Sequence, residues 1–155
     1  MNDTTEWLSP AEQHAWRGFV RLHQKLSARL NRDLQAQSKL SGADYEILVA
    51  LTDVPAGRMR PQDLAQEIDW EQSRLSHQIV RMAKRGLVTR EECAEDGRGT
   101  LVAVTPAGRQ VVEAAAPKHV ATVRRLVIDA LGPDELATLA KIYGRILERL
   151  DDEPS

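Results

Sequence analysis

The stretch from Pro61 to Gly108 is divided by helix-starting and turn-forming residues more sharply than any other part of the chain. Pro61 suits the first position of a helix, because its fixed φ is helical and its missing N–H would have no partner there. Asp69-Trp70 predicts a turn between this short helix and a longer one, which Gly86 ends. The apolar face of the short helix consists of Leu64, Ala65 and Ile68.

Two segments rich in strand-forming residues follow, 87–92 and 101–105. Their connection contains Asp96-Gly97 and Gly99, residues that allow the positive φ angles of tight turns, and predicts a hairpin with Arg98 at its tip. An arginine there can enter a narrow minor groove, and Asp96 can hold it or Arg90 in place. The alternative is a mobile hairpin with no binding role. Two helices, a turn and a hairpin in this order are the outline of a winged helix-turn-helix, which reads duplex DNA.

The longer helix, about 71–85, has two distinct sides when residues are placed about 100° apart around its axis. Leu75, Ile79 and Met82 fall on one side and predict the buried face. The opposite, outward face suits the major groove, where arginine pairs bidentately with guanine, whereas the alternative is a solvated basic surface. The residues on the outward face are Ser73, Arg74, His77, Arg81 and Lys84.

Charge is distributed unevenly along the chain. The net charge is −2 at pH 7, yet residues 71–90 hold five cations and one anion, a local charge of +4. Acids such as Asp134, Glu135 and the tail 151–153 offset this elsewhere. The local excess, rather than the net charge, is what matters for a polyanionic partner.

Helix-starting signals also precede the segments on the N-terminal side. Ser9-Pro10-Ala11-Glu12 has the pattern of a capping box and begins a helix that we expect to run to about Gln35. Ser41-Gly42-Ala43-Asp44 predicts a second cap. The helix that follows is apolar on more than one face, which predicts burial between layers.

On the C-terminal side, Thr105-Pro106 begins a long helix that we expect to be kinked at Pro117 and ended by Gly132-Pro133. The last helix carries an apolar stripe broader than a terminal helix of a small protein needs. We expect this stripe to be the seam of a homodimer, the alternative being that it closes the core of a monomer. The expected seam residues are Leu136, Leu139, Ile142, Tyr143 and Ile146.

These elements predict a mainly α-helical fold with a small β-hairpin wing. The length of 155 residues suits a single-domain subunit, residues 1–155. Within it we expect a winged helix-turn-helix lobe at 41–105 and dimerisation helices at 9–36 and 106–150.

Several classes of function find no support in the chain. Cys93 is the only cysteine, which excludes an internal disulfide and a cysteine zinc cluster, and no two histidines are spaced i, i+4, so we expect no metal site and no cofactor. There is no Gly-rich phosphate loop and no Gly-x-Ser-x-Gly elbow, so we expect no enzyme. The N-terminus lacks a signal pattern and the apolar runs are short, so we expect a cytoplasmic protein without a membrane partner.

The central stretch resembles the MarR-type (multiple antibiotic resistance regulator) transcriptional regulators, whose wing motif is roughly Asp-x-Arg followed by a strand ending Thr-x-x-Gly. The matching residues are Asp96-Gly97-Arg98, Leu101, Thr105 and Gly108, preceded by Arg85-Gly86-Leu87-Val88-Thr89-Arg90. The resemblance implies a cytoplasmic homodimer that binds a pseudopalindromic double-stranded DNA operator, usually as a repressor. It also implies that the helix bearing Ser73, Arg74, Ser76, His77 and Arg81 is the recognition helix and that Arg98 enters the minor groove.

Members of this family often release DNA when a small phenolic or aromatic compound binds. By that analogy, a pocket between the dimerisation helices and the DNA-binding lobe would be lined by Trp16, Phe19, His23 and Tyr45, although aromatic residues at helical spacing are more often core. His77 stands where such helices commonly carry an arginine, so base preference does not carry over. The alternative function is a winged-helix module that binds an acidic protein without specific DNA binding.

Overall fold

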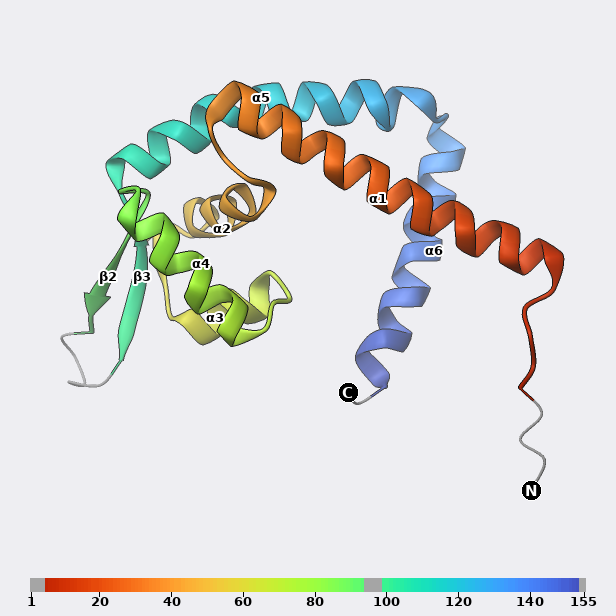
Figure 1. Ribbon diagram of the computed structural model, residues 1–155, viewed down its shortest axis with the longest axis horizontal. Helices are drawn as coiled ribbons and strands as arrows, with labels where there is room; N and C mark the ends of the chain where they lie inside the picture. The colour runs from red at the N-terminus through yellow and green to blue at the C-terminus, as the bar shows by residue number, and fades with distance from the viewer. Residues whose placement is uncertain (1–4, 94–98, 154–155) are drawn as a thin grey trace. The chain divides into compact units, whose positions relative to one another are not determined.

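The computed structural model describes residues 5–93 and 99–153. The chain divides into two compact units, Met1–Ala116 and Pro117–Ser155. The fold is mainly helical with a small antiparallel sheet, as predicted (Figure 1). In chain order the elements are α1 (Pro10–Ser38), α2 (Gly42–Asp53), β1 (Arg58–Met59), α3 (Pro61–Glu67), α4 (Gln72–Lys84), β2 (Val88–Glu92), β3 (Thr100–Val104), α5 (Pro106–Leu126), the 3₁₀ turn η1 (Ile128–Ala130) and α6 (Pro133–Asp152).

Both predicted capping boxes are present. The backbone N–H of Ser9 donates to Glu12 Oε2 at 2.7 Å, and that of Glu12 donates to the Ser9 hydroxyl at 3.3 Å. Ser41 and Asp44 make the same reciprocal pair at 2.9 and 3.0 Å. These bonds satisfy N–H groups that have no partner inside the helix, which is why α1 and α2 begin where the sequence predicts.

The core of the first unit is built around α2. Ile47, Leu48 and Leu51 are fully buried, and α2 contacts α1, α3, α4, β1 and β3. This confirms the prediction that α2 is buried between layers. On α1, by contrast, only Leu34 is buried, whereas Phe19 and Leu22 are exposed.

The sheet contains one strand more than the predicted hairpin. Its order is β1-β3-β2, with β1 paired antiparallel to β3 through Arg58 with Ala103 and Met59 with Val102. Strand β1 has two residues, too few for an alternating pattern to be recognised in the sequence. An ion pair between Arg58 Nη1 and Glu91 Oε2, 2.7 Å long, joins β1 to β2 across the central strand.

Thr105 and Gly108 hold the start of α5 against the end of α4. The Thr105 hydroxyl donates to the Gly86 carbonyl oxygen at 2.6 Å and accepts from the Gly108 N–H at 2.9 Å. A Cβ at Gly108 would lie 2.1 Å from the carbonyl oxygen of Leu87, so a side chain there would force the backbone apart. This close approach gives a structural reason for the Thr-x-x-Gly motif.

The C-terminal helices differ from expectation in one boundary. α5 continues through Pro117 but ends at Leu126, and residues 128–130 form the separate turn η1. The prediction of one helix up to Gly132 was therefore wrong. Repeating apolar residues cannot distinguish the last turn of an α-helix from a 3₁₀ turn, because the two periods differ little over so few residues.

Candidate nucleic-acid interface

The turn before α4 is formed without glycine. Asp69 adopts the left-handed conformation, with φ of 57°, and the N–H of Trp70 donates to the Ala65 carbonyl oxygen at 2.8 Å. Aspartate tolerates this conformation better than most residues. The turn therefore closes α3 and redirects the chain into α4, which contacts α3, α2 and β2.

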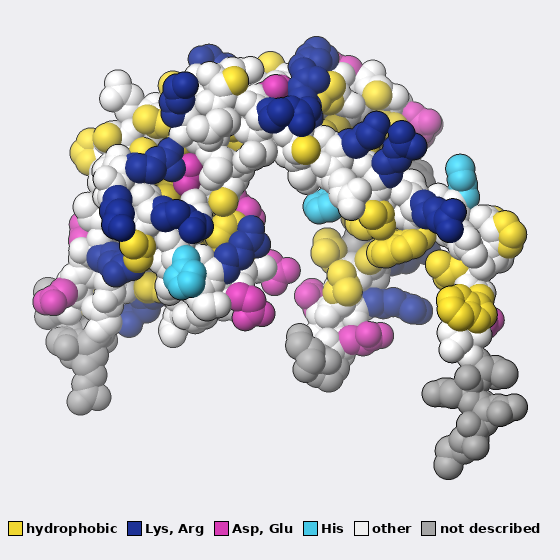
Figure 2. Space-filling view, viewed as in Figure 1, with side chains coloured by type: hydrophobic (Ala, Val, Ile, Leu, Met, Phe, Trp, Pro, Cys, Tyr) yellow, Lys and Arg dark blue, Asp and Glu magenta, His cyan; other side chains and the backbone are white. Residues whose placement is uncertain are grey.

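The two predicted faces of α4 are confirmed as inner and outer faces. Leu75, Ile79 and Met82 are buried in the core. The five residues predicted for the outward face are exposed, as is Ser76, which the family resemblance adds to the recognition helix. Figure 2 shows Lys and Arg side chains gathered over α4 and its neighbours. These six residues, which we call the outer face of α4, are Ser73, Arg74, Ser76, His77, Arg81 and Lys84.

Arg74 is held by an aromatic ring from the preceding turn. Its guanidinium carbon lies 3.6 Å from the centroid of the Trp70 ring, a cation–π contact. Glu46 on α2 stands close to both: burial raises the pKa of its carboxyl, against the opposing effects of the Arg74 charge and a hydrogen bond from Trp70. Stacking restricts the guanidinium before any partner arrives, which lowers the entropic cost of a contact made by Arg74.

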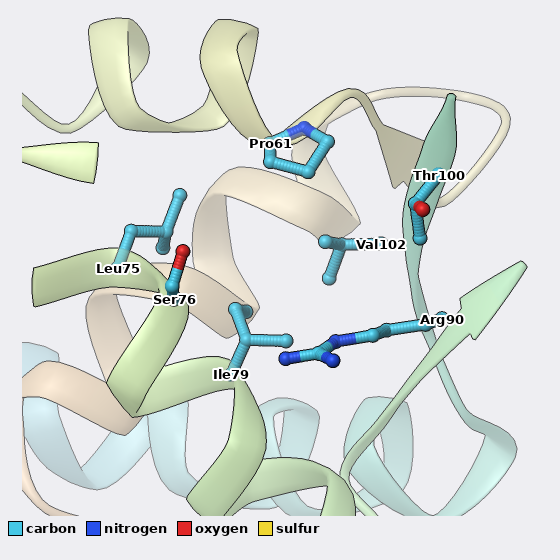
Figure 3. Close-up of a pocket in the computed structure, with 7 residues that line it drawn as sticks. All are labelled: Pro61, Leu75, Ser76, Ile79, Arg90, Thr100 and Val102. Carbon is cyan, nitrogen blue, oxygen red and sulfur yellow. The ribbon is translucent and has the colours of Figure 1, made fainter. Parts of the chain in front are cut away.

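A hollow of about 230 Å³ lies between part of α4 and the sheet (Figure 3). Arg90 of β2 extends across it toward Ile79, and Ser76 lies at its α4 side. Arg90 thus adds a cation beside the outer face of α4. Its charge is evident from the sequence but its place at this site is not, because the pairing of β2 with the rest of the sheet decides where it points. The hollow is lined by Pro61, Leu75, Ser76, Ile79, Arg90, Thr100 and Val102.

The base of the wing is described, but its tip is not. Asp96 and Arg98, both predicted to act at the tip, lie outside the described residues. The N–H of Cys93 donates to the Gly99 carbonyl oxygen at 3.0 Å, and Gly99 has a φ of 118°. A Cβ at Gly99 would lie 3.3 Å from Arg60 Nη1, which places another arginine at the base of the wing.

The predicted effector residues fall into two groups. Trp16, Phe19 and His23 form an exposed row on α1, with stacked rings whose centroids are 5.8 and 6.4 Å apart in succession. Tyr45 is half-buried on α2 and lines a hollow of its own, where burial and the charge of Asp53 raise its pKa. The other residues lining that hollow are Glu46, Val49, Ala50, Asp53, Glu67, Ile68 and Asp69, so Tyr45 does not share it with the α1 row.

The predicted seam residues all lie on α6 in the second unit. Leu136, Leu139 and Ile142 are half-buried, whereas Tyr143 is 45% and Ile146 52% exposed. The stripe continues as Leu147 and Leu150, which are exposed too. An apolar stripe thus stands open on α6 in the single chain.

The described part of the chain contains neither a membrane-spanning helix nor a cluster of metal ligands. None of its helices is long and apolar enough to cross a membrane. Within the same ranges, 5–93 and 99–153, no group of three or more His, Cys, Asp or Glu residues is arranged to hold a metal ion.

Comparison with known proteins finds this architecture in transcriptional regulators of the MarR family. The profile of the MarR family matches residues 38–99, which contain α2, α3 and α4. AbsC, a MarR family transcriptional regulator from Streptomyces coelicolor, is 43% identical in sequence and superposes with a TM-score of 0.91 over 96% of this chain and 100% of its own.

Of two further relatives, one was crystallised with DNA and the other is named as a repressor. Sco3205, a MarR family transcriptional regulator from Streptomyces coelicolor whose crystal structure is a complex with DNA, is 36% identical, with a TM-score of 0.91 over 99% of this chain and 95% of its own. The HTH-type transcriptional repressor YetL from Bacillus subtilis strain 168 is 25% identical over 128 residues, covering 81% of this chain and 76% of YetL. The chain therefore belongs to the MarR family of winged helix-turn-helix, DNA-binding transcriptional regulators.

Proposed function

We propose that this regulator is a repressor that binds a pseudopalindromic operator as a homodimer and releases it when a small aromatic or phenolic effector binds. In this proposal the lobe at 41–105 reads DNA, and the helices at 9–36 and 106–150 join the two subunits. The residues proposed to contact DNA are Ser73, Arg74, Ser76, His77, Arg81, Lys84, Asp96 and Arg98.

The outer face of α4 is the observation that carries the proposal. Its cations and hydrogen-bonding side chains are exposed together, while the opposite side of the same helix is anchored in the core. A helix held in this way presents a fixed set of donors to the major groove, where arginine reads guanine and hydroxyl groups contact base edges or phosphates. Arg90, beside this face, adds positive charge toward the phosphate backbone.

Dimerisation is proposed because one recognition helix contacts too few base pairs for strong discrimination, whereas two copies match the symmetry of a palindrome. The exposed apolar stripe of α6 supports it, since apolar surface of this kind on one helix marks an interaction site more often than a free surface. Leu136, Leu139, Ile142, Tyr143 and Ile146 are its proposed seam.

Repression is proposed from the relative YetL, and effector release from the ring row on α1. YetL is a repressor by name, and this chain shares a quarter of its residues over the aligned region. For the effector, we propose Trp16, Phe19, His23 and Tyr45 as contacts: the exposed ring row on α1 offers stacking surfaces to an aromatic compound.

The proposal is tested by measuring binding to the duplex upstream of the protein's own gene against a random duplex of equal length. We expect preference for the promoter fragment, and an affinity that falls steeply as salt rises because phosphate contacts release counterions. Arg21→Ala, which removes an exposed arginine of α1, serves as a charge-matched control for arginine substitutions on α4. Equal binding to both duplexes at moderate salt would reject specific DNA recognition and favour the protein-binding module instead.

A further inference from the structure

A buried carboxylate lies beneath α4, where the sequence pattern indicates only apolar residues. Asp44 of α2 is 1% exposed. Its Oδ1 accepts a hydrogen bond from Gln78 Nε2 of α4 at 2.7 Å, and its Oδ2 accepts one from Arg85 Nη1 at 2.6 Å and one from the Ser41 N–H at 2.9 Å. A single carboxylate thus binds the middle of α4, its C-terminal end and the start of α2.

The same bonds extend in both directions. Arg85 also donates through Nη2 to the Lys39 carbonyl oxygen, 2.6 Å away, where α1 ends. On the other side, Gln78 Oε1 accepts from Arg81 Nη2 at 2.5 Å, and Arg81 belongs to the outer face of α4. A continuous chain of hydrogen bonds therefore links the α1–α2 junction to a side chain proposed to contact DNA.

The remaining inner contacts of α4 are apolar. Burial of Leu75, Ile79 and Met82 holds the helix to the core, but apolar burial is not directional and tolerates small rotations and shifts. Hydrogen bonds weaken steeply when their angles depart from ideal geometry. Two bonds from one carboxylate to points seven residues apart on α4, Gln78 and Arg85, therefore restrict its rotation and its sliding together.

We infer that Asp44 is a positioning residue that sets the orientation of the recognition helix through Gln78 and Arg85. The inference rests on the proposed recognition of DNA by α4. It assigns to Asp44 no contact with DNA: the carboxylate is buried and carries the same sign of charge as the phosphates. Its effect on binding is transmitted through the placement of the outer face.

Asp44→Asn is the primary test, because charge and positioning predict opposite results. Removal of a negative charge, acting by electrostatics alone, strengthens binding to every duplex. Loss of positioning weakens operator binding, since asparagine has a single accepting oxygen: its N–H₂ group faces the donor of either Gln78 or Arg85 and cannot accept from it. We expect the operator-to-random affinity ratio to fall by about tenfold, with random-duplex binding unchanged or tighter.

Asp33→Asn is the matched control. Asp33 pairs with Arg29 at 3.1 Å within α1, so this variant also removes one carboxylate from an arginine pair, but from a pair that does not include a residue of α4. We expect it to leave the affinity ratio at the wild-type value. Arg85 is 43% exposed as a side chain, so water can solvate its guanidinium when Asp44 is changed, and the fold can be checked by circular dichroism and thermal unfolding.

Gln78→Met provides a second variant that keeps the Asp44–Arg85 pair. Methionine fills a similar volume but neither donates to Asp44 nor accepts from Arg81, so we expect the affinity ratio to fall while the salt dependence of binding stays at the wild-type slope. A lost phosphate contact would instead reduce the slope by about one. An unchanged ratio in folded Asp44→Asn and Gln78→Met would overturn the inference, whereas failure of the wild-type protein to prefer its operator would overturn the proposed function.

Discussion

Helices α4 and α6 have similar patterns in the sequence but different surroundings in the structure. Each carries an apolar stripe on one side and charged residues on the other. In α4 the stripe of Leu75, Ile79 and Met82 is buried in the chain's own core, and the polar side is exposed. In α6 no residue is buried, and the apolar side stands open from Tyr143 to Leu150.

The difference shows that an apolar stripe in the sequence identifies a helix face that is to be buried. It does not identify whether the same chain or another subunit buries it. For α4 the cover is α2, α3 and the sheet, so the remaining face is available to a polar partner. For α6 the open stripe favours a second subunit, because exposed apolar surface gains stability when removed from water. Substitutions on the two helices, and a change of pH, test this contrast.

Leu75→Ala, on the inner side of α4, should lower the free energy of unfolding by about 2–5 kcal/mol, because it leaves a cavity in a closed core. Leu147→Ala on α6 is the matched change at an exposed position. We expect its loss of stability to depend on protein concentration, because Leu147 continues the α6 stripe that we propose as the dimer seam. Thermal unfolding at several concentrations measures both, and a concentration-independent loss in Leu147→Ala would place that residue in a subunit core.

Ile146→Asp places a charge in the proposed seam. We expect dimerisation to weaken by about 2 kcal/mol or more, because the carboxylate would be buried without a partner. Folding of the subunit should be retained, as Ile146 is exposed in the single chain. Analytical ultracentrifugation measures the association, and operator binding should be lost in parallel. A dimer of wild-type affinity would locate the seam elsewhere.

Arg74→Ala removes one cation from the outer face of α4. We expect operator affinity to fall by about 1–3 kcal/mol if the arginine contacts a base, with the dimer and thermal stability unchanged. Trp70→Leu should give part of this loss, since it removes the ring on which Arg74 stacks. Fluorescence anisotropy with labelled operator tests both against Arg21→Ala. Wild-type affinity in Arg74→Ala would exclude this residue from recognition.

Acid should weaken the hydrogen bonds that join Asp44 to Gln78 and Arg85. Burial raises the pKa of the Asp44 carboxyl, but hydrogen bonds from Arg85 and Ser41 and the Arg85 charge outweigh it, so the pKa lies below the ordinary value. The stabilisation from Asp44 is therefore complete above the unfolded pKa of about 3.9 and lost as pH falls through the lower folded pKa. Below about pH 4, the thermal unfolding temperature should fall more steeply with decreasing pH in the wild type than in Asp44→Asn. If the unfolding temperatures of the two proteins fell equally with pH, Asp44 would not contribute to the loss of stability in acid.

Local signals predicted much of the fold and part of the site. The capping residues Ser9 and Ser41 set the starts of α1 and α2, and the helical period separated Leu75, Ile79 and Met82 from the outer face of α4. These succeed because a cap or a helical stripe depends on residues within a few positions of one another. Strand β1 was missed because it has only two residues and depends on pairing with the distant strand β3. The end of α5 was misplaced because the periods of an α-helix and a 3₁₀ turn differ little over a few residues.

By itself, the sequence determined the order of helices and hairpin, the two sides of α4 and the positive charge gathered there, because all three depend on local spacing. Only the tertiary structure decided that Gln78 is buried and that Asp44 bonds both to Gln78 and to Arg85, which lies 41 residues after Asp44 in the chain. The tertiary structure alone also decided that the apolar stripe of α4 is buried and that the apolar stripe of α6 is exposed. The physical reason is that burial and hydrogen-bond partners are properties of the packed chain, which no single segment specifies.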